Sequence, residues 1–178
     1  EDCEIAIERY DLLHNLDFEW RSVALYAKKD LKATLCENIF NEFRESIFVD
    51  CQLDNDSSLL IGIVYRSPSS SNENTERLNQ LLIKVSEMKA THKLIMGDFN
   101  FPEIDWSSNR SEVGANHAAS KFLKVTKDAF FTQYQLSPTR YREGQKANTV
   151  DLVFTNRDDM IDEIVTNAGL GKSDHFSL

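Results

Sequence analysis

The sequence predicts a layered α/β fold, in which helices pack against a sheet of mixed strand direction. Three observations support this prediction. Residues 47–53 alternate apolar and polar side chains and residues 59–65 are apolar on both faces, which are the two common patterns of β-strands. Leucine and valine then recur at helical spacing over residues 78–88. Two later runs, 94–96 and 149–155, are mainly apolar and typical of buried strands.

The N-terminal half is predicted to consist of strands. Residues 23–28 and 31–36 precede the strands at 47–53 and 59–65, and turn-forming residues lie between them, so we expect consecutive hairpins. Asp54 to Ser57 would form the last of these turns. The strand at 59–65 belongs in the middle of the sheet because both of its faces are apolar.

Helices and strands alternate in the C-terminal half. Ser70 and Glu73 have the spacing of a capping box, so the first helix should begin with Ser70 as its N-cap. A polar loop at 107–114 leads to a second helix with alanine and phenylalanine on its inner side. Further strands are expected at 149–155 and 160–166.

The composition is that of a globular protein with one domain, residues 1–178, since 41% of the residues are hydrophobic and 28% are charged. No apolar run approaches the roughly 18 residues of a membrane span. The acidic start, Glu1 to Glu4, argues against a signal peptide, so we expect a nuclear or cytoplasmic protein that is not secreted. The three cysteines and four histidines are dispersed, without metal-ligand spacing, and the thiols are expected to be reduced.

The net charge of −9 by itself disfavours nucleic acid as a partner. Residues 121–146 differ, because six basic residues there face only two acidic ones. Aromatic residues are interleaved with them. Such a stretch can follow a phosphate backbone, but a helix with one solvated and one apolar face has the same composition. The basic residues are Lys121, Lys124, Lys127, Arg140, Arg142 and Lys146, and the aromatic ones are Phe122, Phe130, Phe131, Tyr134 and Tyr141.

A polar sequence, Gly97-Asp-Phe-Asn100, ends the apolar run at 94–96. Side chains alternate along a strand, so Asp98 and Asn100 should project to the same side. Ligands bind outside the carboxyl ends of strands in α/β sheets, and a carboxylate beside an amide suits a phosphate and its attacking water. A polar turn that closes a strand is the alternative interpretation.

Asp151 is an acidic residue within the apolar strand 149–155. A buried carboxylate needs a partner. His175 is the candidate whose side chain suits this role, since an acidic residue can orient an imidazole. Alternatively, the strand lies at an edge with Asp151 in water. Ser173, Asp174 and His175 are successive, which excludes a nucleophile triad. On a turn, Asp174 and His175 could instead present a carboxylate and an imidazole to one pocket.

Tyr65 and Arg66 end the strand at 59–65. Together they offer a phenol and a guanidinium to phosphate oxygens. The alternative for Tyr65 is a core aromatic residue with a solvated hydroxyl.

Taken together, these motifs resemble the endonuclease/exonuclease/phosphatase superfamily, in the order Tyr65–Pro68, Gly97–Asn100, Thr149–Asn156 and Ser173–His175. More narrowly, the chain is similar to the endonuclease domain of LINE-type non-LTR retrotransposons. Residues 95–106 and 138–144 are close to the usual sequence motifs of that group. The similarity runs over nearly all of the chain, from about Tyr10.

The resemblance implies a DNase I-like sandwich of two mixed sheets flanked by helices, with a metal-dependent phosphodiesterase site. By its position, Asp98 would activate or hold the attacking water, while Asn100 and Tyr65 would contact the scissile phosphate. His175, oriented by Asp151, would stabilise the charge that develops on phosphorus.

The same resemblance implies Mg²⁺ as the cofactor, with Mn²⁺ as a substitute, and Asp174 near the metal. Thr139 matches a position that contacts DNA, and Arg66, Arg140 and Ser173 are further candidates for DNA contacts. DNA is the expected partner, and a reverse transcriptase is expected in the same full-length polypeptide. No membrane partner is expected.

The chain also departs from the family pattern. An asparagine and a glutamate, the main metal ligand, would precede Glu1, and Glu4 and Glu8 lie in the wrong context to replace them. Arg21 and Ser22 stand where relatives have glycines. We therefore expect a domain that lacks its first strands, is partial at both ends, and nicks DNA weakly or not at all. The alternatives are a non-catalytic retroelement remnant or binding module, or a phosphoesterase of the same fold with a non-DNA substrate.

Overall fold

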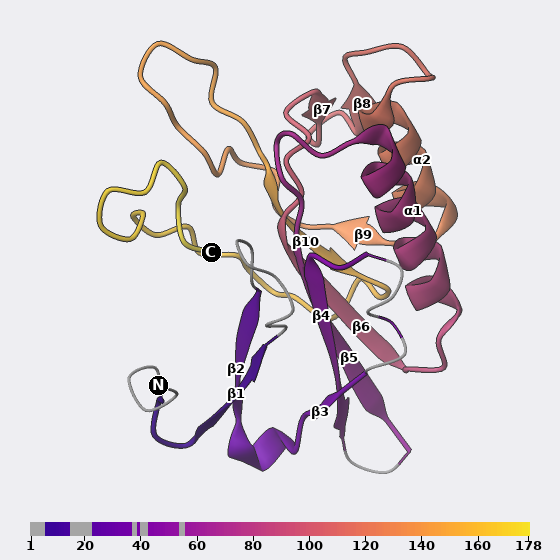
Figure 1. The fold of residues 1–178 in the computed structure, drawn as a ribbon, viewed down its shortest axis with the longest axis vertical. Coiled ribbons are helices and arrows are strands. Elements are labelled where there is room, and N and C mark those ends of the chain that lie inside the picture. The colour runs from indigo at the N-terminus through magenta and orange to yellow at the C-terminus, as the bar shows by residue number, and fades with distance from the viewer. Residues whose placement is uncertain (1–5, 15–22, 37–38, 40–42, 54–55) are drawn as a thin grey trace.

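The computed structural model describes residues 6–14, 23–36, 39, 43–53 and 56–178. A six-stranded sheet forms the centre of the fold (Figure 1). Strands β5 and β6 run parallel, and the other neighbouring strands are antiparallel, so the sheet is mixed as predicted. In spatial order the strands are β3 (Thr34–Leu35), β4 (Ser46–Gln52), β5 (Ser58–Tyr65), β6 (His92–Asp98), β10 (Asp151–Thr155) and β9 (Thr132–Gln133).

Two helices, α1 (Asn72–Glu87) and α2 (Ala118–Asp128), lie next to each other on one face of this sheet (Figure 1). The apolar stripe of α1 that the sequence predicts is buried against the sheet. Fully burying one such leucine or valine side chain contributes about 1.5–3 kcal/mol to stability. The stripe therefore holds α1 on the sheet, and α1 is the crossover connection that lets β5 and β6 run parallel.

The other face of the sheet packs against a two-stranded antiparallel ribbon, β1 (Tyr10–His14) and β2 (Ala24–Lys28) (Figure 1). Val23, Ile47, Val49 and Cys51 form a second buried cluster, which the sequence does not separate from the first. Within the described residues the second sheet is this ribbon alone, so the prediction of two mixed sheets is correct for one of them. Both described α-helices cover the same side of the fold.

The predicted run of hairpins is partly wrong. β4 and β5 form a hairpin as expected, and β3 pairs with β4. β2, however, pairs with β1 and not with β3, and a 3₁₀ turn at Lys29–Leu31 separates β2 from β3. The chain therefore changes sheets at this turn, a step that strand patterns alone do not reveal because each strand has an apolar face in either arrangement.

The predicted N-cap of α1 is displaced by one residue. Ser71, not Ser70, is the N-cap, and its hydroxyl accepts a hydrogen bond from the backbone N–H of Asn74 at 3.1 Å. A capping side chain reaches the N–H three residues ahead, so the helix start at Asn72 selects Ser71. Ser70 instead accepts a hydrogen bond from the side chain of Asn74 at 2.8 Å.

The strand predicted at 160–166 does not form. Its acidic residues are exposed and Val165 is 58% exposed, so no apolar face packs on the sheet. Beyond it, an isolated bridge joins Asn167 to Ser177. Short strands β7 (Ile104–Asp105) and β8 (Arg110–Ser111) form a hairpin, and only β8 lies within the region 107–114 that was predicted as a polar loop.

Several predictions concern residues outside the described ranges, namely Glu4, Cys3, Arg21, Ser22 and the turn residues 54–55. In the described ranges, Cys36 and Cys51 are free thiols. No helix in those ranges is long and apolar enough to cross a membrane.

Candidate active site

The register of the sheet assembles the candidate site at one end of β6. Asp98, the last residue of β6, pairs with Tyr65 of β5 on one side and with Asp151 of β10 on the other. Gly97 permits this arrangement, since its φ is +140° and a Cβ would lie 1.9 Å from the carbonyl oxygen of Val64. Only glycine fits so close to the neighbouring backbone. The glycine of Gly97-Asp-Phe-Asn100 is therefore a packing requirement of the site.

Asn100 meets Asp98 through a turn and not through simple strand alternation. The strand ends at Asp98, and Asn100 has a φ of +49°, a left-handed conformation that asparagine tolerates better than most residues. Its backbone N–H donates to Asp98 Oδ1 at 3.0 Å, and its side-chain Nδ2 donates to Asp98 Oδ2 at 2.9 Å. Both carboxylate oxygens of Asp98 are thus held by one residue.

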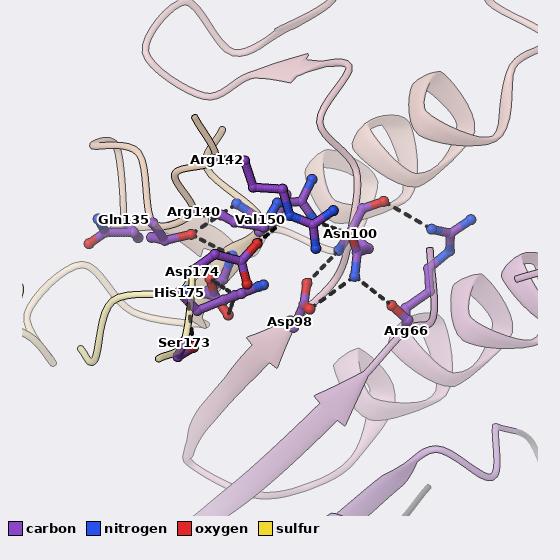
Figure 2. A network of polar contacts seen from close by, with 12 residues as sticks. Arg66, Asp98, Asn100, Gln135, Arg140, Arg142, Val150, Ser173, Asp174 and His175 are labelled. Atoms are coloured by element: carbon purple, nitrogen blue, oxygen red, sulfur yellow. Dashed lines mark hydrogen bonds and ion pairs between the residues drawn. The ribbon is translucent and has the colours of Figure 1, made fainter. Parts of the chain in front are cut away.

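Two arginines fix Asn100 in turn (Figure 2). Arg140 Nη1 donates to Asn100 Oδ1 at 3.0 Å, and Arg66 Nη1 donates to the Asn100 backbone oxygen at 3.0 Å. Asn100 Nδ2 also donates to the backbone oxygen of Arg66 at 3.2 Å. The amide group of Asn100 is therefore fully engaged within the protein, and a contact with a phosphate would have to replace one of these bonds.

Arg66 lies inside the protein, with 6% of its surface exposed. Its Nε donates to Thr75 Oγ1 at 3.1 Å, and its guanidinium carbon lies 4.1 Å from the centre of the Phe101 ring. Burial lowers the pKa of Arg66, opposed by the charges of Glu103, Glu45 and Asp98. The structure gives Arg66 a role in holding the Asn100 loop, while its contact with DNA stays a prediction.

The predicted partnership of Asp151 and His175 is confirmed in geometry (Figure 2). His175 Nδ1 lies 2.9 Å from Asp151 Oδ2 and 3.2 Å from Asp151 Oδ1. The backbone N–H of His175 donates to Ser173 Oγ at 3.1 Å, which shapes the turn that carries the ring. The alternative, Asp151 on an edge strand in water, is wrong because β10 lies between β6 and β9.

Thr139 holds the backbone at the start of β10, where Asp151 lies. Its side chain is fully buried, and its hydroxyl accepts hydrogen bonds from the backbone N–H groups of Val150 at 3.1 Å and Asp151 at 3.0 Å. These two N–H groups lie at the start of β10, where the strand does not yet pair with β9. Thr139 therefore supports the site internally, and its contact with DNA stays a prediction.

The carboxyl group of Asp98 has an unusual pKa, raised to about 6. Burial is the largest cause, and the nearby charge of Asp151 adds to it. His175, the N–H of Asn100 and the charge of Arg140 act in the opposite direction. Asp98, Asp151 and His175 each offer a ligand atom within 4.8 Å of one another, so these groups could hold a metal ion. A cation there would relieve the repulsion between the two carboxylates.

Other predicted site residues lie around this cluster. The Asp174 carboxylate accepts a hydrogen bond from Arg142 Nε, and this bond lowers the pKa of Asp174. Its role as a metal ligand stays a prediction, as do the predicted contacts of Ser173 with DNA and Tyr65 with phosphate. Tyr65 packs against the second hydrophobic cluster, beside Asp98 in the sheet, so it is at least partly the core residue of the alternative interpretation.

The sequence pattern indicated the residues of this site but not the hydrogen bonds by which the two arginines hold Asn100. Arg140 and Asn100 are 40 residues apart, and Arg66 and Asn100 are 34 apart, so no local spacing links them. The basic stretch also has two parts. Lys121, Lys124 and Lys127 lie on the solvated face of α2, with Phe122 buried on its other face. Arg140 and Arg142, in contrast, lie beside Asp98 and Asp174.

Comparison with known proteins gives a family match and a shared fold. The family described as Endonuclease-reverse transcriptase matches residues 59–178. The endonuclease domain of TRAS1, a telomere-specific non-LTR retrotransposon, aligns with a TM-score of 0.71 at 15% identity over 96% of this chain and 78% of that one. The 3′ phosphatase NExo from Neisseria, bound to a product DNA hairpin, has a TM-score of 0.63 at 10% identity over 94% and 77%.

A third structure, the mannosyl-6-phosphatase Bt3783 from Bacteroides thetaiotaomicron, has a TM-score of 0.54 at 12% identity over 98% of this chain and 77% of that one. No curated protein sequence matches the chain. At these identities the likeness to the solved structures is a likeness of fold.

Proposed function

The chain belongs to the Endonuclease-reverse transcriptase family of the endonuclease/exonuclease/phosphatase superfamily, and from this we propose that its Asp98 centre hydrolyses phosphodiester bonds of DNA. The observation that carries the proposal is the convergence of Asp98, Asn100, Asp151 and His175 from separate strands and loops. The TRAS1 protein is an endonuclease domain of a retrotransposon, and this chain shares its fold.

Asp98 is suited to accept the proton of the attacking water. A base works best when its pKa lies near the operating pH, and the pKa of Asp98 is raised to about 6. Asn100 holds both of its oxygens, so the carboxylate cannot rotate away. The water oxygen would attack phosphorus as its proton moves to Asp98, while the bond from phosphorus to one ester oxygen breaks and that oxygen leaves as an alkoxide that takes a proton from solvent.

His175 is suited to stabilise the phosphate in the transition state. Asp151 engages Nδ1, which leaves Nε2 as the ring nitrogen that can donate to a phosphate oxygen. The contact with Asp151 fixes the orientation of the ring. Tyr65, Ser173 and Arg140 would contribute contacts to the scissile or neighbouring phosphates.

The carboxylates of Asp98 and Asp151 would hold a divalent cation, and Asp174 is a further candidate ligand. Carboxylate oxygens are ligands that suit Mg²⁺ and also Mn²⁺. Such an ion would neutralise phosphate oxygens and the leaving group. Since no residue of the 178 matches the expected glutamate ligand, we propose that metal binding and nicking by this chain are weak.

The wider context follows the same proposal. A reverse transcriptase would lie in the same full-length polypeptide, and the site of action would be the nucleus or the cytoplasm. The family match supports the first of these statements.

Conversion of supercoiled plasmid to open circles, with protein in excess and Mg²⁺ or Mn²⁺ present, tests the proposal. We expect slow nicking that stops with a chelator and falls by at least about 100-fold in Asp98→Ala and His175→Ala, because general acid–base catalysis contributes that much. Asp128→Asn, which changes an exposed carboxylate on α2, should nick like the unmodified chain. Nicking that survives Asp98→Ala would exclude the assigned centre, and efficient nicking lost in that variant would exclude only the weak-activity proposal.

A non-catalytic binding module is the second candidate, favoured by the full engagement of the Asn100 amide within the protein. It predicts no metal-dependent nicking and equal DNA binding by the unmodified chain, Asp98→Ala and His175→Ala. A panel of non-DNA phosphoesters in the same assay separates the remaining alternative, a phosphoesterase of this fold with another substrate.

A further inference from the structure

The turn that carries His175 is held on one side by the chain segment that begins at Thr139. The backbone N–H of Phe176 donates to the Thr139 oxygen at 2.8 Å. The backbone N–H of Tyr141 donates to the Asp174 oxygen at 2.9 Å. Since these bonds involve the residues directly before and after His175, the backbone of His175 lies beside this segment.

The same turn is held on its other side by residues that precede it in the chain. Asn167 N–H donates to the Ser177 oxygen at 2.8 Å, and Ser177 N–H donates to the Asn167 oxygen at 3.2 Å, which makes an antiparallel bridge. The hydroxyl of Ser177 also donates to the Ala168 oxygen at 3.2 Å. The chain therefore folds back on itself and brings Gly169 against His175.

Gly169 lies closer to this turn than any side chain would allow. A Cβ on Gly169 would lie 2.4 Å from the carbonyl oxygen of His175 and 2.9 Å from that of Ser173. Both oxygens belong to the backbone, so neither can swing aside as the end of a flexible side chain could. Gly169 is not one of the glycines with a positive φ, so glycine is required here for space and not for backbone conformation.

The close packing at Gly169 does not serve the hydrophobic core. Of the described residues, none after Phe154 belongs to either hydrophobic cluster. Leu170, next to Gly169, is 84% exposed. The contact therefore acts on the turn that carries His175, at a place where the protein gains little from apolar burial.

We propose that Gly169 is a positioning residue for His175, an inference that rests on the function proposed for the Asp98 centre. The absence of a side chain lets the turn close, and the closed turn places His175 Nδ1 at 2.9 Å from Asp151 Oδ2. A group that stabilises phosphate charge in the transition state must be held in place before the reaction. Gly169 supplies part of that hold without touching the imidazole or the substrate.

A methyl group at position 169 would disturb this geometry. The carbonyl oxygen of His175 would have to retreat by about 1 Å to reach an ordinary van der Waals distance, or the segment that contains Gly169 would have to swing away. In both cases the turn loses one of its two supports. The imidazole then loses its fixed distance to Asp151, because a hydrogen bond weakens steeply when its length and angle change.

The ring proton of His175 tests this positioning without any catalysis. A carboxylate can only accept a hydrogen bond, so the contact with Asp151 keeps a proton on Nδ1. In the full chain, labelled with ¹⁵N-histidine and held metal-free by a chelator, we expect NMR to detect this N–H because the hydrogen bond slows its exchange with water. The Nδ1–H resonance should vanish in Gly169→Ala, as it should in Asp151→Ala.

Leu170→Ala and Gly114→Ala are the controls. Leu170 belongs to the same turn but is exposed, and a Cβ on Gly114 would meet nothing within 4 Å. Both variants should keep the Nδ1–H resonance of His175. A resonance that persists in Gly169→Ala would overturn the proposal, and so would its absence from the unmodified chain.

Plasmid nicking, with protein in excess, measures the consequence for catalysis. Because a displacement of about 1 Å can cost about 100-fold in rate, Gly169→Ala should nick about 100-fold more slowly than the unmodified chain and bind the plasmid equally well. The midpoint of urea unfolding should stay the same, since no core contact changes. A midpoint that falls together with nicking would assign the loss to unfolding and overturn the proposal.

The two measurements also separate this proposal from the function proposed for the Asp98 centre. Slower nicking by Gly169→Ala with the Nδ1–H resonance retained would show that the effect does not pass through His175, which overturns the proposal. If the unmodified chain does not nick DNA, the hydrolytic function fails. The NMR comparison with Gly169→Ala then decides by itself whether Gly169 positions His175.

Discussion

Arg140 donates from Nη1 to the side-chain oxygen of Asn100 at 3.0 Å, and this contact decides which way the Asn100 amide faces. A guanidinium can only donate, so it selects the oxygen of the amide and turns Nδ2 toward Asp98. The nitrogen then donates to Asp98 Oδ2 at 2.9 Å. A residue 40 positions away in the sequence thus sets the hydrogen bonding of the carboxylate at the centre of the site.

We expect Arg140→Gln to raise the pKa of Asp98. The positive charge of Arg140 lowers this pKa, and a neutral side chain removes that effect, so the carboxylate should protonate at a higher pH than in the unmodified chain. Carbon-detected NMR titration of the Asp98 carboxyl group measures the shift directly. Arg142→Gln is the control, because Arg142 pairs with Asp174. A titration midpoint that is unchanged in Arg140→Gln would contradict the prediction.

Asp98 should also make the stability of the protein depend on pH. Its pKa is about 6 in the folded chain against an ordinary value of 3.8 for an aspartate, so the folded state binds more protons between these pH values. The free energy of unfolding should therefore fall as pH rises from about 4 to about 7, relative to Asp98→Asn, by about 1–3 kcal/mol. Urea unfolding of both proteins at the two pH values gives the difference. A difference that does not change with pH would show an ordinary pKa.

Thr139→Val should destabilise the fold and disturb the site together. Valine has the same shape but no hydroxyl, so the N–H groups of Val150 and Asp151 would lose their acceptor inside the protein. We expect a cost of about 1–3 kcal/mol in the free energy of unfolding. Thr139→Ser, which keeps the acceptor, should retain most of the stability. Unchanged stability of Thr139→Val would contradict the role of the hydroxyl, and a larger loss in Thr139→Ser than in Thr139→Val would assign the effect to packing of the methyl group.

Gly97→Ala should be among the most damaging single changes. The new Cβ would lie 1.9 Å from the Val64 oxygen, and both atoms belong to the paired backbones of β5 and β6, which cannot move apart without breaking the sheet. We expect a loss above about 3 kcal/mol, measured by chemical unfolding. Gly114→Ala, whose Cβ would meet nothing within 4 Å, is the control and should be close to neutral. A small loss of stability in Gly97→Ala would contradict the close approach of Gly97 to the Val64 oxygen.

Local sequence patterns are sufficient to predict the strands that carry the site and the chemical character of the residues at their ends. Local patterns suffice for β5, β6, β10 and α1, because the period of apolar residues depends only on the backbone of each element. They also marked Asp151 as a carboxylate in need of a partner and proposed His175, which the structure confirms. Order and residue type along the chain were enough to indicate the family that the comparison shows.

Which side chains meet is known from the folded chain and not from these patterns. The tertiary structure assigned Thr139, Arg66 and Arg140 to internal support of Asp151 and Asn100, and it divided the N-terminal strands between two sheets. The reason is that a hydrogen bond acts over about 3 Å in space, whereas sequence patterns report only on neighbours along the chain. The Gly97–Asn100 turn was visible in the sequence, but the arginines that orient it became visible only once the chain had folded.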